Sequence, residues 1–405
     1  MSAPDLEYLL RRGVAEIIVE RELRELLREG TPLRLKMGFD PSRPDLHLGY
    51  AVALRKLRQF QELGHQVILI VGDWTARIGD PSGMSAARQM LSEEQVNANA
   101  QTYMRQFFKI VDREKTQVVF QSEWYGKFTL ADVIQLTSKF TVAQMLARED
   151  FAQRYEAQRP IAITEFLYPL LQGYDSVAIR SDVEFGGMDQ KFNCLVGRDI
   201  QEMSGQRRQQ VFLMPLLAGT DGRKMSQSLG NYIAFEEPPN DMYGKVMSVP
   251  DTIMMDYFEL LTDVPDGELR EMRRELEQQS VNPMILKHRL AAEIVGQFHG
   301  AQAAKDAEAH FRRVVQERAV PEDIPTHSLQ ELRNLLAHDN LTALTPAQII
   351  DVLSAWKLVE SKGEARRLIN QGAVEIDEVR VKDEAVPFRE GTIIKVGKRR
   401  FVKLV

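Results

Sequence analysis

The sequence is poor in features that would place the protein outside the cell or in a membrane. Its 405 residues include one cysteine, Cys194, which cannot form an internal disulfide and therefore favours a reducing, cytoplasmic location. No apolar run reaches the length of a membrane span, and the charged N-terminal stretch lacks the short apolar core of a signal peptide. We therefore expect no membrane partner.

Two common nucleotide-binding motifs are also absent. Neither GxGxxG nor a P-loop pattern occurs, which excludes the usual dinucleotide and P-loop sites. The formal net charge of −6 does not fit a protein that coats nucleic acid. The charge is uneven: residues 356–405 hold 12 Lys and Arg against 8 Asp and Glu, about +4, which leaves about −10 elsewhere. This basic end indicates polyanion binding confined to one region, although a solvated basic face explains the charge equally well.

The apolar pattern of residues 1–235 predicts an α/β fold with a Rossmann-like, doubly wound parallel sheet. Residues 32–39 alternate like a strand, a helix follows from Leu48, and the apolar run 66–74 is typical of a parallel strand buried on both faces. Further strands are expected at 116–121, 176–187 and 211–219, and helices at 130–158 and 190–204. The first 27 residues have the pattern of an amphipathic helix.

The remainder of the chain predicts two further domains. From Pro238 the stretches are charged and helical, with Pro and Gly only at breaks, which predicts an α-helical domain over 236–325. A linker is expected near 320–327. Residues 345–405 begin as a helix and continue as short alternating segments separated by glycines, which predicts a small α+β module.

Two stretches are candidates for chemistry. HLGY (47–50) follows the first predicted strand and opens a helix, so it lies at the sheet edge where open parallel sheets bind ligands. Helix N-terminal amides favour phosphate, and His47 could bond a phosphate whose charge grows in a transition state. A histidine that only caps the helix explains HLGY at least as well. GTDGRKMSQSLGNY (219–232), rich in Gly, Lys and Ser, follows another strand and suits triphosphate oxygens.

Together, HLGY and KMSQS resemble the HxGH and KMSKS signatures of class I aminoacyl-tRNA synthetases. The surrounding stretches GFDPSRPDLHLG, IGDPSG, residues 166–193 and MPLLAGTDGRKMSQSLGNYI are similar to those of bacterial tyrosyl-tRNA synthetases, over nearly the whole chain. SKGEARRLINQGAVEIDEVRV resembles the RNA-binding module shared with a small-subunit ribosomal protein. The resemblance implies a tyrosine–tRNA ligase, which activates tyrosine with ATP as tyrosyl-adenylate and transfers it to tRNA(Tyr).

The resemblance also implies roles for individual residues. The residues expected in catalysis are Ser42, His47, Lys224 and Ser226. The ATP-binding set is Gly38, Asp40, His47, Gly49, Tyr50, Arg88, Lys224, Met225, Ser226, Gln227 and Ser228. The tyrosine-binding set is Lys36, Asp80 (near the ammonium), Tyr168, Gln172, Asp175, Asp189 and Gln190. The RNA-binding set is Lys362, Arg366, Arg367, Lys398, Arg399 and Arg400.

The same resemblance implies the substrates and the assembly. ATP is expected as a substrate with Mg2+, without a tightly bound cofactor and without a metal held by protein ligands. The catalytic domain is expected to pair as a homodimer through the segment at about 115–165. Its other partners are tyrosine and tRNA(Tyr).

Several positions depart from the family pattern. Tyr50 replaces the second histidine of HxGH, and Gln227 replaces the second lysine of KMSKS. Met84 stands where a basic residue usually follows GDPSG, and Met188 stands where its motif usually has Ser or Thr. Losing two charge-assisted hydrogen bonds of about 1.5–3 kcal/mol each would slow a reaction roughly 10²–10⁴-fold. Two alternatives therefore stay open: a diverged synthetase paralogue with altered amino acid or weakened catalysis, and a non-catalytic RNA-binding or regulatory protein.

Overall fold

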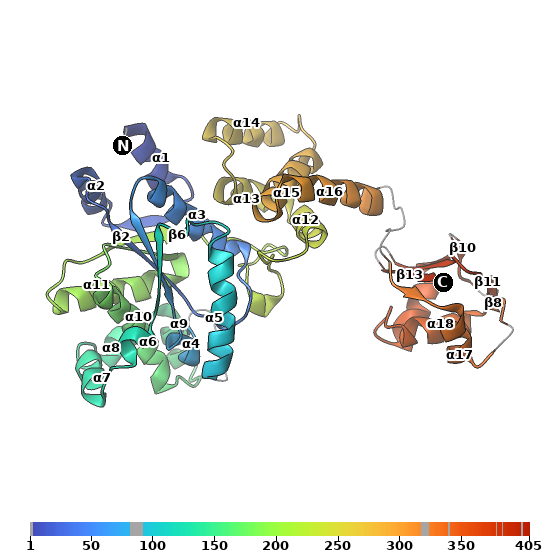
Figure 1. Ribbon diagram of the computed structural model, residues 1–405, viewed down its shortest axis with the longest axis horizontal. Coiled ribbons are helices and arrows are strands. Elements are labelled where there is room, and N and C mark those ends of the chain that lie inside the picture. The colour runs from blue at the N-terminus through green and yellow to red at the C-terminus, as the bar shows by residue number, and fades with distance from the viewer. Residues whose placement is uncertain are drawn as a thin grey trace. The chain divides into compact units, whose positions relative to one another are not determined.

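A six-stranded sheet forms the centre of the first of two compact units, Met1–Ala304 and Lys305–Val405, in the computed structural model (Figure 1). The structure describes residues 3–81, 92–316, 324–338, 341–377, 379–382, 384–397 and 400–405. The strand order is β1-β6-β5-β2-β3-β4. The strands are β1 (Glu16–Ile18), β2 (Arg34–Phe39), β3 (Gln66–Val71), β4 (Thr116–Phe120), β5 (Val183–Gly187) and β6 (Gln210–Met214).

Five of these strands run parallel, as the sequence predicts for a doubly wound sheet. The apolar run of β3 is fully buried from Val67 to Val71, because helices cover both faces of such a sheet. The exception is β1, which pairs antiparallel with β6 at one edge. The fold class predicted from the sequence is therefore confirmed, with one antiparallel edge strand added.

The predicted N-terminal helix is wrong as a single element. The first residues form α1 (Ala3–Arg11), strand β1 and then α2 (Glu20–Glu29). Gly13 ends the first helix with a positive φ of 62°, a conformation that suits glycine. Backbone pairing with β6 then holds the residues between the helices as a strand, which overrides their helical periodicity.

Two other predicted strands are shorter than expected. The segment 176–187 begins as the end of α10 (Ile163–Ala178), turns at Arg180 with φ 51°, and becomes a strand only at Val183. The segment 211–219 stops being a strand at Met214, because Pro215 has no backbone N–H to donate to the ladder.

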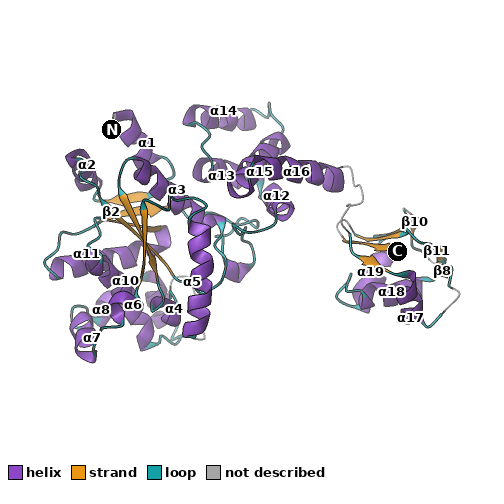
Figure 2. Cartoon of the chain, in the orientation of Figure 1, coloured by secondary structure: helices purple, strands orange, loops and turns teal. Residues whose placement is uncertain are grey.

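Helices surround the sheet in the first unit (Figure 2). Between β2 and β4 these are α3 (Leu48–Glu62), α4 (Thr75–Ile78) and α5 (Glu93–Phe107). Between β4 and β6 they are α6 (Ser122–Tyr125), α7 (Leu130–Thr137), α8 (Val142–Leu146), α9 (Glu149–Glu156), α10 and α11 (Lys191–Met203). Single-turn 3-10 helices lie at Met188–Gln190, Gln227–Leu229 and Asp251–Ile253.

A helical segment follows the sheet within the same unit. It comprises α12 (Pro239–Ser248), α13 (Met254–Leu261), α14 (Asp266–Glu277), α15 (Pro283–His299) and the start of α16 (Ala301–Phe311). The buried Arg12 ties it to the N-terminus by donating to the carbonyl oxygens of Glu259 and Thr262 at 3.1 and 2.8 Å and to the Asp266 carboxylate at 3.1 Å. The predicted boundary at 235/236 falls inside this unit and stays a prediction.

The second unit is the predicted small α+β module, preceded by the end of α16 and a π-helical turn at Arg312–Gln316. Its five-stranded sheet has the order β10-β9-β12-β13-β7. The strands of the unit are β7 (Thr326–His327), β8 (Ala343–Leu344), β9 (Val374–Ile376), β10 (Val379–Arg380), β11 (Val386–Pro387), β12 (Ile393–Val396) and β13 (Arg400–Leu404). Its helices are α17 (Leu329–Leu336), α18 (Pro346–Ala355) and α19 (Lys362–Asn370), which share one apolar core with the sheet.

None of the helices in the described ranges is both long and apolar enough to cross a membrane.

Candidate active site at the carboxyl edge of the sheet

The two signature stretches lie side by side. The backbone N–H of Leu48 donates to Ile233 at 3.0 Å, and that of Phe235 donates to Leu46 at 2.9 Å. These bonds join the start of α3 to the segment that follows KMSQS. The side chain of Gln227 also donates to the carbonyl oxygen of Asp45. Sequence positions almost two hundred residues apart therefore form one edge of the site.

His47 is the N-cap of α3. Its Nδ1 accepts the backbone N–H of Gly49 at 3.2 Å, which is the capping role that the sequence left open. Burial, and then the charge of Lys224, lower the pKa of His47 to about 4, so the imidazole is neutral near pH 7. Because Nδ1 accepts, the ring proton is on Nε2, which can donate to a ligand. The cap and a phosphate contact are thus compatible in one side chain.

Gly49 has no room for a side chain, because a Cβ there would lie 2.9 Å from two atoms of the His47 ring. Tyr50, which departs from the family pattern, packs its ring on His47 with centroids 4.6 Å apart and lies 5.7 Å from Phe39. This position therefore supports the capping histidine by aromatic packing.

The KMSQS loop is held by polar contacts, and its buried Met225 donates its backbone N–H to the carbonyl oxygen of Leu217 at 2.9 Å. Lys224 pairs with Asp189 at 2.6 Å, and both side chains are partly exposed. Ser226 Oγ accepts the backbone N–H of Ser228 at 3.2 Å. Asp189, predicted in the tyrosine set, thus lies beside the lysine of the phosphate loop.

Sequence reasoning missed Asn231, which shapes this loop. Its side chain accepts the N–H of Ser226 at 2.8 Å and donates to the carbonyl of Lys224 at 3.0 Å and to the Asp221 carboxylate at 2.7 Å. Hydrogen bonds from Asn231 and Arg223 lower the pKa of Asp221 to about 2. The pattern GTDGR before the motif was the available signal, because Asp and Gly form tight turns.

Asp40 lies at the end of β2 and receives two hydroxyl hydrogen bonds. Thr75 Oγ1 donates to Oδ1 at 2.7 Å and Tyr168 donates to Oδ2 at 2.8 Å. Gly72, which sequence reasoning did not single out, makes this arrangement possible, because a Cβ there would lie 2.3 Å from Asp40 Oδ1 and 2.4 Å from Thr75 Oγ1. Gly38 has no atom within 4 Å of its Cβ position, so β2 is open beside Asp40.

Tyr168, Gln172 and Asp175 are on one face of α10, at spacings of four and three residues. The Asp175 carboxylate is 2% exposed and accepts from Gln121 Nε2 at 2.8 Å and Trp124 Nε1 at 3.1 Å. Burial raises the pKa of Asp175 to about 7, against the opposing charge of Lys36. Gln121 and Trp124 were missed, because nothing in their local pattern shows which distant side chain they contact.

A second carboxylate, Asp80, lies at the other end of the tyrosine set. It accepts from Gln190 Nε2 at 2.6 Å and pairs with Arg148 at 3.4 Å. Arg148 is 5% exposed and also pairs with Asp150 at 2.7 Å. This buried arginine was not singled out in the sequence, although it fixes the position of Asp80.

Two more of the predicted residues of the catalytic domain lie among the described residues. Ser42 lies half-buried in the turn after β2, where its N–H donates to the Asp40 carbonyl at 2.7 Å. Lys36 is fully buried beneath the tyrosine set. Arg88 and the departure Met84 lie outside the described residues, as do Lys398 and Arg399.

In the C-terminal module, Arg366 and Arg367 are exposed on α19. Lys362 pairs with Asp351 at 2.7 Å. Arg400 donates to Glu364 at 3.1 Å, so this arginine is engaged within the module. Among the described residues, no group of three or more His, Cys, Asp or Glu is placed to hold a metal ion.

Comparison with known families defines the class of protein. The model of the tRNA synthetases class I (W and Y) matches residues 28–316, and the S4 domain model matches residues 349–394. The chain therefore belongs to the class I tRNA synthetase family of the tryptophan and tyrosine enzymes.

Relatives of known name narrow this further. The tyrosine–tRNA ligase of Dehalococcoides mccartyi strain CBDB1 is 57% identical over 405 residues, covering 100% of this chain and 99% of the relative. That of Thermotoga maritima is 50% identical over 408 residues, covering 100% and 98%.

Solved structures share the fold. A C-terminally truncated mitochondrial tyrosyl-tRNA synthetase of Aspergillus nidulans matches with a TM-score of 0.65 at 21% identity, over 76% of this chain and 94% of its own. The tyrosyl-tRNA synthetase of Archaeoglobus fulgidus, complexed with L-tyrosine, matches with a TM-score of 0.62 at 22% identity, over 75% and 99%.

Proposed function

We propose that this chain is a tyrosine–tRNA ligase, which forms tyrosyl-adenylate from tyrosine and ATP and transfers the tyrosyl group to tRNA(Tyr). The observation that carries the proposal is the meeting of two sites at one sheet edge. The His47 and KMSQS stretches lie together there, and Lys224 of KMSQS pairs with Asp189 of the tyrosine set. Full-length relatives at 50–57% identity carry the same activity in their names.

On the phosphate side, the chain supplies a neutral donor and a cation. Nε2–H of His47 donates to a phosphate oxygen, and Lys224 leaves Asp189 to meet the charge of the pyrophosphate. Ser226 and the backbone N–H groups around it complete the loop. ATP enters with Mg2+, which belongs to the substrate and lowers the repulsion between its phosphates.

On the amino-acid side, the buried carboxylate of Asp175 gives specificity for a phenol. With phenylalanine bound, no hydroxyl would meet that carboxylate, so a hydrogen bond to a charged group, worth about 1.5–3 kcal/mol, would be lost. Gln121 and Trp124 hold the carboxylate, so it cannot rotate away. Asp80, Gln172 and Gln190 suit the ammonium, because they supply carboxylate and amide oxygens.

The two alternatives are less well supported. A non-catalytic protein would not need the interlocked hydrogen bonds of Asp40, Tyr168 and Asp175. A paralogue for another amino acid does not explain why the tyrosine set includes a buried carboxylate, that of Asp175. The departures at Tyr50 and Gln227 both make defined contacts of their own.

The C-terminal module is proposed to bind tRNA through its exposed basic residues, among them Arg366 and Arg367. The helical segment over 236–325 is proposed as the anticodon-binding domain, and the cytoplasm as the location. Deleting the module should weaken aminoacylation and leave adenylate formation intact. Equal loss of both activities would contradict this division of labour.

A homodimer is part of the same proposal. The segment 130–163 exposes large apolar side chains, with exposed fractions of 75% for Leu130, 62% for Val142 and 82% for Ile163. Surfaces of this kind mark protein–protein contacts. Ile134→Lys, in the same segment, should shift the protein to monomer in sedimentation at micromolar concentration. A parent protein that is already a monomer would rule the dimer out.

The decisive experiment is tyrosine-dependent ATP–pyrophosphate exchange, with phenylalanine and tryptophan as controls. Exchange with tyrosine alone is the expected result. Tyrosine binding in calorimetry without exchange would mean that the phosphate side has lost its function. It would favour the RNA-binding or regulatory alternative.

A further inference from the structure

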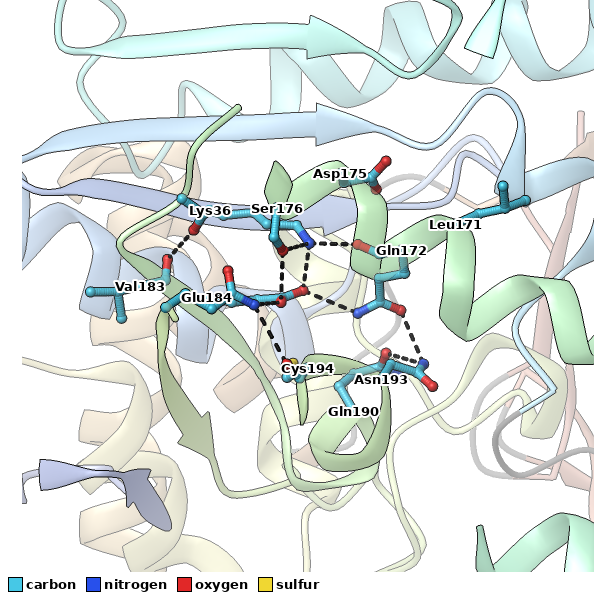
Figure 3. A network of polar contacts seen from close by, with 12 residues as sticks. Lys36, Leu171, Gln172, Asp175, Ser176, Val183, Glu184, Gln190, Asn193 and Cys194 are labelled. Carbon is cyan, nitrogen blue, oxygen red and sulfur yellow. Dashed lines mark hydrogen bonds and ion pairs between the residues drawn. The ribbon is translucent and has the colours of Figure 1, made fainter. Parts of the chain in front are cut away.

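A buried ion pair lies beneath the tyrosine set. Lys36 and Glu184 have side chains 0% and 2% exposed, with Nζ and Oε1 2.9 Å apart (Figure 3). The ammonium of Lys36 also donates to the carbonyl oxygen of Gln172 and to Ser176 Oγ, both at 2.7 Å. A lysine has three N–H donors, and all three are used. Lys36 therefore has no donor left for a ligand, so any role in binding tyrosine must act through its neighbours.

A chain of side-chain hydrogen bonds runs from this ion pair to Asp80. Gln172 Nε2 donates to Glu184 at 3.2 Å, and Asn193 Nδ2 donates to Gln172 Oε1 at 3.0 Å. Asn193 Nδ2 also donates to Gln190 Oε1 at 3.0 Å. Gln190 Nε2 then donates to Asp80 at 2.6 Å. Three amides thus link two carboxylates.

The charged groups fix the direction of every amide in this chain. Glu184 is acceptor-only, so Gln172 must turn its NH2 toward it and its oxygen toward Asn193. At the far end, Asp80 accepts from Gln190, and Arg148, a donor only, meets the oxygen of Asn193 at 3.1 Å. Flipping the Gln172 amide would set an oxygen against a carboxylate and an NH2 against an NH2.

We propose that Lys36 and Glu184 are positioning residues, which point the oxygen of Gln172 at the ammonium of the bound amino acid. This inference rests on the proposed tyrosine site. Glu184 sets the direction of the amide, and Lys36 holds Glu184 in place through their ion pair of 2.9 Å.

The test removes both charges and preserves the shapes. In Lys36→Met with Glu184→Gln, the new amide can donate or accept, so Asn193 is the remaining partner that sets the direction of Gln172. Calorimetry compares tyrosine, tyramine and 3-(4-hydroxyphenyl)propionate, of which only the first two carry an ammonium. We expect roughly 10–100-fold weaker binding of tyrosine and tyramine, from the loss of a charge-assisted hydrogen bond. Binding of the propionate should change less than twofold.

Kinetics and a control separate positioning from folding. In pyrophosphate exchange, KM for tyrosine should rise and KM for ATP should stay constant. Lys56→Met is the matched control, because Lys56 is 4% exposed and donates to the Leu9 carbonyl at 2.9 Å, away from this network. It should leave all three affinities unchanged.

Two results would overturn the proposal. Equal weakening of all three ligands would mean a collapsed pocket, and unchanged binding of both amines would mean that the amide direction does not matter. Failure of the parent protein to bind any of the three would instead refute the tyrosine site itself.

Discussion

Replacing Gly72 by alanine is a direct test of the geometry around Asp40. The new Cβ would lie 2.3 Å from Asp40 Oδ1 and 2.4 Å from Thr75 Oγ1, so at least one of these groups must move. Asp40 accepts one hydrogen bond from Thr75 and one from Tyr168. Hydrogen bonds to charged groups are worth about 1.5–3 kcal/mol each, so partial loss of the two should lower the free energy of unfolding by about 2–4 kcal/mol.

The same displacement should slow the chemistry. If Asp40 borders the adenylate, misplacing one charge-assisted contact of about 1.5–3 kcal/mol would slow adenylate formation roughly 10–100-fold. Stopped-flow measurement of adenylate formation and urea unfolding give the two quantities. Gly244→Ala is the control: Gly244 lies in α12 with no atom within 4 Å of its Cβ position, and the change should stabilise by about 0.5–1 kcal/mol. A Gly72→Ala protein with unchanged stability and rate would refute the placement of Asp40.

Two further predictions concern single side chains. The pKa of Asp175 is about 7 in the fold against 3.8 unfolded, so the folded protein binds this proton more tightly and loses stability as pH rises between those values. The free energy of unfolding of Asp175→Asn, measured in urea, should therefore rise by about 2–3 kcal/mol relative to that of the parent between pH 5 and pH 8. A difference between the two proteins that does not change with pH would contradict the raised pKa. His47→Asn keeps a good N-cap and loses the Nε2 donor. It should hold stability within about 0.5 kcal/mol and slow adenylate formation roughly 10–100-fold. Tyrosine affinity should be unchanged, and a large loss of it would mean that His47 is misplaced.

The sequence predicted the parts of this protein that depend on local pattern. β2, α3 and β3 were found within two or three residues, because apolar periodicity, a turn-rich break and a glycine after the helix mark them. The structure of the first 27 residues was not predicted correctly, because the pairing of β1 with β6 depends on residues almost two hundred positions away. Local pattern carries no information about that partner.

The site shows the same division. His47 and Lys224 stand in recognisable motifs, and the structure brings the two stretches together. Gly72, Trp124 and Arg148 had no such signal, because their importance lies in neighbours that come from other parts of the chain. A glycine after a strand or a buried arginine has many explanations until its neighbour is known. Contacts of this kind are properties of the fold and not of any sequence window.

The two departures in the signature motifs have a common physical consequence. Gln227 uses its amide to hold the carbonyl of Asp45, and Tyr50 packs on the capping histidine, so both positions fix the site without adding charge. Within KMSQS, Lys224 is the only cation, and it is paired with Asp189 at 2.6 Å. When ATP binds, that lysine exchanges one carboxylate for a polyphosphate of greater charge. The free energy gained on ATP binding is the difference between these two ion pairs. It is smaller than the free energy gained when a phosphate contacts a lysine that was in water. Binding of ATP should therefore be more sensitive to Asp189 than the exposure of this residue suggests, because its carboxylate competes with the substrate for the cation.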